Sequence, residues 1–337
     1  MSRILKPGMS LDDFNTQVIE DSQGKHDYNV LSNQVKMDIH GKLVTKPLVE
    51  SDGFKLNFTE LGFRQMCQKL NAPELSDYGL KLYELGQTAR LSQLFNYHLE
   101  EINKAGERDL WLRSKNEKCR AVFSGKYGVY DNDFLSDVIL DAFKDKNVDV
   151  VTNSISDNYM NCRIRLLDSQ FNASDDDPLF TAIHVQNSEV GLSSVNVFLV
   201  VYRQVCTNGM VRQVSKNTIF RHKHIGDGYQ NRQAVAEKLN LAFEYTQQQG
   251  NEILEEFAQT QSELVEMPME AIEVLSKGEG YSQKFTERVV QNYLVEKNPT
   301  RYGIINAFTG AARELQDERR LEVERFAGTL LTRKIPV

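Results

Sequence analysis

The chain has 337 residues, of which 40% are hydrophobic and 26% charged, and its formal net charge is −7. This length suits one main domain with additions, and the apolar content can bury a sizeable core. The longest apolar run, residues 197–202, has only the length of a strand, so we expect no membrane-spanning helix. Four dispersed cysteines without a CxxC pair, and a start without a signal-peptide pattern, predict a reduced, cytoplasmic protein.

Residues 1–110 are expected to form strands and helices that pack on a core. Apolar residues alternate weakly over 28–58, which predicts short strands. Thr59 is suited to cap a helix over 60–71, and residues 76–104 carry two further helical patterns.

Residues 111–228 are expected to form an antiparallel β core with one helix. The strands are predicted at 120–130, 148–155, 160–167, 180–186 and 194–205, and the helix at 132–144. Residues 169–178 are polar and are expected to form a loop. Asn208-Gly209 predicts a type I′ turn, because both central positions of that turn need positive φ.

Residues 229–337 have a helical period. The candidate helices are 230–249, 251–265, 268–276, 286–296 and 304–331. The predicted fold class is therefore α+β: a central antiparallel sheet of hairpins with helical N-terminal and C-terminal additions.

Positive charge is concentrated around the predicted turn. Between Val200 and Arg232 the chain has one acid, Asp227, and six basic residues: Arg203, Arg212, Lys216, Arg221, Lys223 and Arg232. A polyanion site in this acidic chain would therefore be local.

A second predicted hairpin combines basic and aromatic residues, the pairing that single-strand binders use for phosphates and bases. The candidate nucleic-acid contacts from both hairpins are Arg120, Lys126, Tyr127, Arg203, Arg212, Lys216, Arg221, His222, Lys223 and His224. The order of hairpins and helix is similar to that of the annealing proteins of phage recombination. A charged edge strand that prevents sheet-to-sheet aggregation explains the same residues equally well.

Several short motifs occur in a characteristic order along the chain. They are RAVFSGKY at 120–127, NSEVG at 187–191, CTNG at 206–209, RH at 221–222, NAFT at 306–309 and AG at 327–328. In these motifs the chain resembles the phage- and plasmid-associated family known as domain of unknown function 932. The resemblance implies a mobile-element context, among replication, recombination or host-takeover genes, and no established catalytic chemistry.

Other chemistry has weaker support in the sequence. Cys206 with His222 and His224 lacks a fourth metal ligand nearby, and the aspartates 175–177 with Asp168 fit a solvated loop better than a cation site. Residues 124–127 lack the spacing and the Ser/Thr of a phosphate-binding P-loop. We therefore expect no metal, cofactor or catalysis, and we expect the Glu189 carboxylate to pair with an arginine near its loop.

Two functions remain open at this stage. The first is single-stranded DNA binding or annealing in replication or recombination, by a homo-oligomer assembled through the C-terminal helices. The alternative is a protein-interaction module whose partners are host or phage proteins and which inhibits or modulates a host enzyme or defence system.

Overall fold

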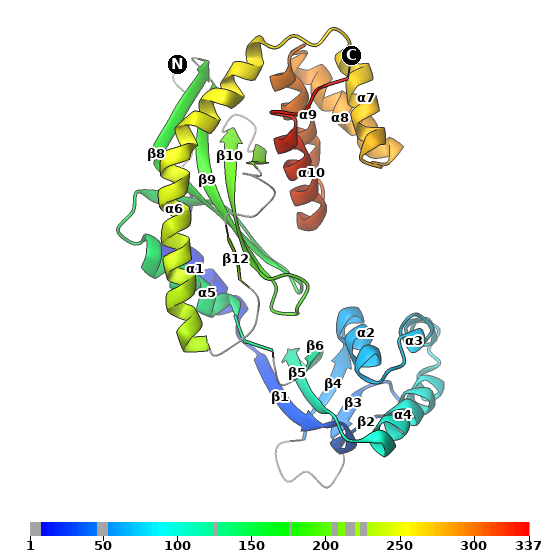
Figure 1. Ribbon diagram of the computed structural model, residues 1–337. Helices are drawn as coiled ribbons and strands as arrows, with labels where there is room; N and C mark the ends of the chain where they lie inside the picture. Colours follow the sequence, from blue (N-terminus) through cyan, green and yellow to red (C-terminus); the bar gives the residue numbers. More distant parts are fainter. Residues whose placement is uncertain are drawn as a thin grey trace.

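The computed structural model contains two sheets and three groups of helices (Figure 1). It describes residues 8–45, 53–124, 127–174, 177–203, 208–212, 220–222 and 228–336. Helices lie at both ends of the chain and flank the sheets, so the predicted α+β class is confirmed. The expected single sheet is instead two, which we call the N-terminal sheet and the central sheet.

The N-terminal sheet has the order β1-β5-β6-β4-β3-β2. Its strands are β1 (Lys25–Leu31), β2 (Val35–Met37), β3 (Leu43–Thr45), β4 (Lys55–Phe58), β5 (Asp109–Lys115) and β6 (Lys118–Phe123). It packs with α2 (Glu60–Lys69), α3 (Glu74–Glu84) and α4 (Thr88–Ala105) around one apolar cluster. The Thr59 hydroxyl accepts from the Gly62 N–H at 3.1 Å, which confirms the predicted cap. The expected boundary at residue 110 falls inside β5, so this unit extends to the end of β6.

The central sheet is antiparallel and has the order β11-β10-β9-β8-β7, with β12 also paired to β10. Its strands are β7 (Val148–Ile155), β8 (Met160–Ser174), β9 (Asp177–Asn187), β10 (Val195–Arg203), β11 (Asn208–Arg212) and β12 (Phe220–His222). The predicted loop at 169–178 was wrong, because β8 and β9 continue into it. Phe171 pairs with Leu179 there and packs on the C-terminal core, which favours the longer hairpin.

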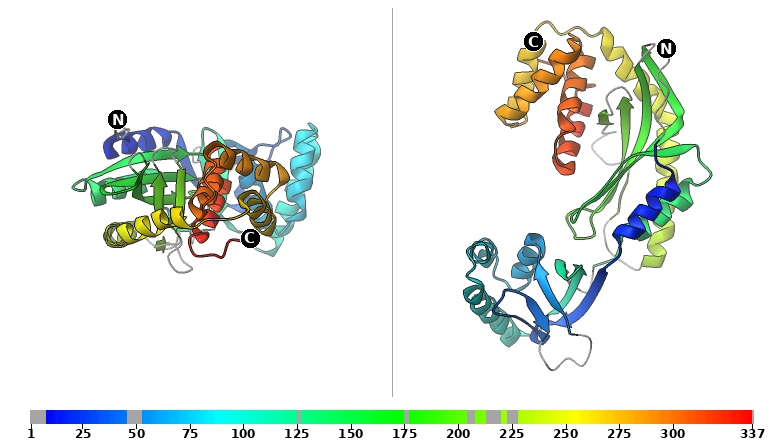
Figure 2. Two further views of the ribbon diagram at one scale, coloured as in Figure 1. Left: turned by 90° about the horizontal axis from the view of Figure 1, so that it is seen from above. Right: turned by 180° about the vertical axis from the view of Figure 1, so that it is seen from behind.

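Side chains alternate between the two faces of the central sheet. Met160, Cys162 and Ile164 of β8 belong to an apolar cluster that the helices on one face complete. These helices are α1 (Leu11–Asp21), α5 (Asn132–Phe143) and the first half of α6 (Gly228–Gln259). Figure 2 shows α1, α5 and α6 together on this side of the sheet. We call the opposite side the polar face.

The predicted turn at Asn208-Gly209 was also wrong. Both residues lie in β11, where Asn208 pairs with Arg203 and Gly209 with Tyr202. This register sets Val211 opposite Val200 and so keeps apolar side chains together. The connection is therefore made by residues 204–207, which lie outside the described residues.

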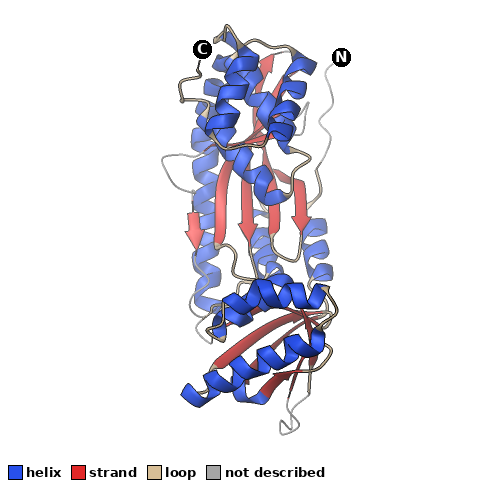
Figure 3. Ribbon diagram, turned by 90° about the vertical axis from the view of Figure 1, so that its right-hand side faces the viewer, coloured by secondary structure: helices blue, strands red, loops and turns tan. Residues whose placement is uncertain are grey.

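The C-terminal helices are α6, α7 (Pro268–Gly278), α8 (Gln283–Glu296), α9 (Arg301–Ala312) and α10 (Asp317–Thr329). They differ from the prediction in two places. The two helices expected over 230–265 are mostly one continuous α6, and the long helix expected over 304–331 is broken between α9 and α10. Residues 302–312 of α9 are all buried, whereas α10 turns back so that Leu321 packs on the polar face. Figure 3 shows the C-terminal helices in front of the sheet's upper part, and no described helix is long and apolar enough to cross a membrane.

Gly250 explains why α6 can continue where the sequence suggested a break. A Cβ atom at this position would lie 2.8 Å from Thr181 Cγ2 of β9, so only glycine lets the helix approach the sheet this closely. Replacing it with alanine should lower the urea midpoint, with a cost of about 1–3 kcal/mol for overpacking. Gly278→Ala, at a helical glycine with no atom within 4 Å of such a Cβ, is the matched control and should be neutral or stabilising. Equal midpoints for the two variants would contradict this explanation.

Candidate nucleic-acid interface

Five polar residues form a row across the polar face. Each pairs directly with the next, strand to strand, in the order Ser154, Asn161, Gln186, Asn196 and Arg221. Directly paired residues of an antiparallel sheet point to the same face. The row spans β7, β8, β9, β10 and β12, which is four strand spacings of about 4.8 Å, or roughly 19 Å. We call it the polar row.

A cavity of about 360 Å³ lies at the β7–β8 end of this row. Its lining includes Thr152, Ser154, Asn161, Arg163 and His184 from the sheet and Arg320 from α10. The cavity therefore lies between the polar face and the helix that partly covers it.

Arg163 is the central cation of the cavity, and its side chain is 4% exposed. Its Nε donates to His184 Nδ1 at 3.1 Å, and its Nη2 pairs with Glu324 of α10. Its Nη1 has no hydrogen-bond partner among the described residues. The buried Glu324 carboxylate also accepts from Arg320 Nε at 2.9 Å, so one acid holds two arginines in place.

His184 is a neutral link in this network. Burial, and then the charges of the arginines at 163, 325 and 320, hold its pKa well below the usual value. Because its Nδ1 accepts from Arg163, the proton of the neutral ring lies on Nε2, which donates to Asn161 Oδ1 at 3.2 Å. Gln186 Nε2 donates to the same oxygen at 3.1 Å, which connects the cavity to the polar row.

Positive charge exceeds negative charge around the cavity. Besides Arg163 and Arg320, Arg325 lies over the Phe198 ring with its guanidinium carbon 4.4 Å from the centroid. These three cations share one buried carboxylate, that of Glu324. An anionic group is therefore the favoured occupant of the cavity.

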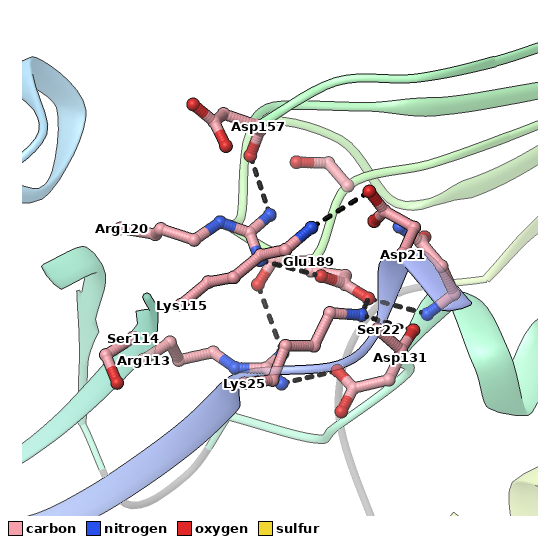
Figure 4. A network of polar contacts seen from close by, with 12 residues as sticks. Asp21, Ser22, Lys25, Arg113, Ser114, Lys115, Arg120, Asp131, Asp157 and Glu189 are labelled. Atoms are coloured by element: carbon pink, nitrogen blue, oxygen red, sulfur yellow. Dashed lines mark hydrogen bonds and ion pairs between the residues drawn. The ribbon is translucent and has the colours of Figure 1, made fainter. Parts of the chain in front are cut away.

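Arg120 lies elsewhere, in a buried network between the two sheets (Figure 4). Its Nη1 contacts the Glu189 carboxylate at 3.1 Å, and its Nη2 donates to the Asp157 carbonyl at 2.8 Å. The same carboxylate accepts from Lys25 Nζ at 2.5 Å and from the Asn132 N–H at 2.7 Å. The expected pairing of Glu189 with an arginine is confirmed, and it neutralises Arg120 inside the protein.

Tyr127 is packed beside this network. Its ring stacks on Phe123 with a centroid distance of 3.7 Å, and its hydroxyl donates to the Ser188 carbonyl at 3.4 Å. Burial raises the pKa of this phenol well above its usual value. The ring therefore has a neighbour on one face that fixes it in the N-terminal unit.

The remaining candidates fall into two groups. Arg203 pairs with Glu296 at 2.7 Å, whereas Arg221 is exposed and its Nε donates to Ser194 Oγ at 3.2 Å. Arg212 and His222 belong to β11 and β12, and Lys126, Lys216, Lys223 and His224 lie outside the described residues. Arg221 is thus the predicted contact that the structure brings to the polar row.

The sequence analysis missed the cavity, although one signal was readable. In β8 the polar Asn161, Arg163 and Arg165 alternate with apolar residues, so they share one face of a strand. The partners on β9 and α10 depend on register and helix placement, which alternation alone does not reveal. Among the described residues, no three His, Cys, Asp or Glu are placed to hold a metal ion. Of the cation site weighed at Asp168, the described part is a carboxylate that accepts from Asn147 Nδ2 at 2.6 Å, and Cys206 lies outside the described residues.

Comparison with known proteins gives one match. A family model described as a domain of unknown function, number 932, matches residues 122–329. This range covers well over half of the chain and includes the central sheet, the cavity and α10. No curated protein and no solved structure matches significantly.

Replacing Glu189 with glutamine tests the buried network. The variant leaves Lys25 and Arg120 buried without a carboxylate, and removing one partner of a buried ion pair costs about 3–5 kcal/mol. We expect a clearly lower urea midpoint. Glu101→Gln, which removes the exposed partner of Lys104, is the control and should unfold with the parent. An unchanged midpoint for the Glu189 variant would contradict a structural role for the network.

The same variant predicts a pH dependence. Burial alone would raise the pKa of Glu189, but Lys25, the Asn132 N–H and Arg120 together lower it below its usual value. Such a carboxylate contributes stability above its unfolded pKa of about 4.3, and that stability is lost as pH falls through the lower folded pKa. The stability deficit of Glu189→Gln should therefore be full at neutral pH and shrink in strong acid. Asp131, whose pKa burial raises, has the opposite sign but is present in both proteins. A deficit that does not vary with pH would contradict the assignment.

Proposed function

The chain belongs to the domain of unknown function 932 family, and we propose that it binds single-stranded nucleic acid on the polar face of its central sheet. The observation that carries the proposal is the polar row next to a cavity with surplus arginine charge. The row offers hydrogen-bonding groups along a line, and the arginines offer phosphate contacts.

The geometry favours an open strand over a duplex. Duplex DNA is usually read by a helix or a ribbon that enters the major groove, which is about 12 Å wide. Here the polar groups lie on a sheet that α10 partly covers, so the ligand must be thin enough to enter beside the helix. A single strand, with its bases unpaired, meets that requirement.

The row also connects the cavity to the basic segment found in the sequence. Arg221 ends the row on β12, and Lys223 and His224 follow it directly in the chain. A strand bound along the row would continue onto this segment. A role in replication or recombination, as the family resemblance suggested, is the context we propose for this binding.

Replacing Arg221 and Lys223 together with glutamine tests the proposal. Loss of two phosphate contacts should weaken binding of a labelled single-stranded oligonucleotide similarly for every sequence. The salt dependence of log K should become shallower by about two units, close to one for each lost contact. Fluorescence anisotropy between about 50 mM and about 200 mM salt measures both effects.

A matched control removes two charges far from the polar face. Arg64→Gln with Lys104→Gln, on α2 and α4, should bind as the parent does. Equal loss in both double variants would indicate a general charge effect. No binding by the parent at low salt would overturn the proposal and favour the protein-interaction alternative.

A further inference from the structure

We infer that the cavity between β7–β9 and α10 is a binding site for a phosphate monoester, carried by the end of a nucleic-acid strand or by a free nucleotide. The inference rests on the proposed function for its link to nucleic acid. It goes further by assigning one chemical group to one place.

The first argument is the unsatisfied nitrogen of Arg163. A buried polar group without a hydrogen-bond partner costs about 1–3 kcal/mol, more if charged, and such groups in native proteins often indicate an unseen ligand. Nη1 has no partner among the described residues, although the other two guanidinium nitrogens are well bonded. Because Arg163 lines the cavity, a ligand oxygen there would supply the missing acceptor.

The second argument is charge. Arg163, Arg320 and Arg325 contribute three positive charges and Glu324 contributes one negative charge. The other described acids of the surrounding elements are engaged elsewhere: Glu322 with Arg319, Asp149 with Arg165, and Glu318 with Tyr159. A phosphate monoester carries about −1.5 to −2 at neutral pH, so it matches the surplus better than a backbone diester does.

The third argument is preorganisation. Glu324 is fully buried and fixes the guanidinium groups of Arg163 and Arg320 before any ligand arrives. Planar guanidinium groups held in this way suit the oxygens of a phosphate. Thr152, Ser154 and Asn161 line the same cavity and bring neutral polar groups. Its volume of about 360 Å³ lies at the lower end of the range for small-ligand pockets, about 300–1,000 Å³.

The test compares one short internally labelled oligonucleotide with a 5′-phosphate, a 3′-phosphate or hydroxyl groups at both ends. One of the phosphorylated forms should bind the parent at least about tenfold tighter than the hydroxyl form, the factor expected for a charged hydrogen bond of about 1.5 kcal/mol. Competition with a nucleoside monophosphate and with inorganic phosphate separates a strand end from a free ligand.

Two neighbouring arginines provide matched variants. Arg320→Gln should abolish the preference for the phosphorylated end and leave binding of the hydroxyl form nearly unchanged, and Arg320→Lys should restore part of the preference. Arg319→Gln, at an exposed position paired with Glu322, should behave as the parent. Equal affinity for all three ends, with the parent binding well, would overturn the phosphate site and leave the proposed function standing. Thermal stabilisation by the nucleoside monophosphate that Arg320→Gln abolishes, without oligonucleotide binding, would support the site and overturn the proposed function.

Discussion

The separation of apolar and polar side chains onto opposite faces of the central sheet is the constraint on which the rest of the structure depends. The period of two in β8 to β10 sends one set of side chains into the core formed with α1, α5 and α6. The other set includes Arg163 and His184, which cannot be buried without hydrogen-bonding partners. The helix α10 supplies Glu324 and some apolar cover, and the space that remains beside it is the cavity.

A second constraint is the buried Glu189 carboxylate, which joins the two sheets. Lys25 and Arg120 come from the N-terminal sheet, whereas Glu189 and the Asn132 N–H come from the central part of the chain. Nearby, Arg113 of β5 pairs with Asp131 and donates to the Glu189 carbonyl at 3.2 Å. Residues that a linear reading assigns to phosphate binding thus contribute to the contact between the two units.

Local signals predicted much of the fold. The hairpin of β7 and β8, the helix α5 and the cap at Thr59 all follow from periodicity and from single residues that favour one conformation. The errors arose where tertiary contacts decide. A glycine at position 250 reads as a helix break until the close approach of Thr181 is known, and Asn208-Gly209 reads as a turn until the register with β10 is known. The cavity depends on the same kind of information, because Arg163, His184 and Glu324 are far apart in sequence and meet only through register and packing.

Hydrogen exchange of the full chain, with and without a single-stranded oligonucleotide at low salt, tests the central claim most directly. If nucleic acid binds on the polar face, amides of β8, β9 and α10 should exchange more slowly in the complex, and those of α2 to α4 should be unchanged. Protection confined to the N-terminal helices, in a sample shown to contain the complex, would place the binding surface elsewhere and contradict the account.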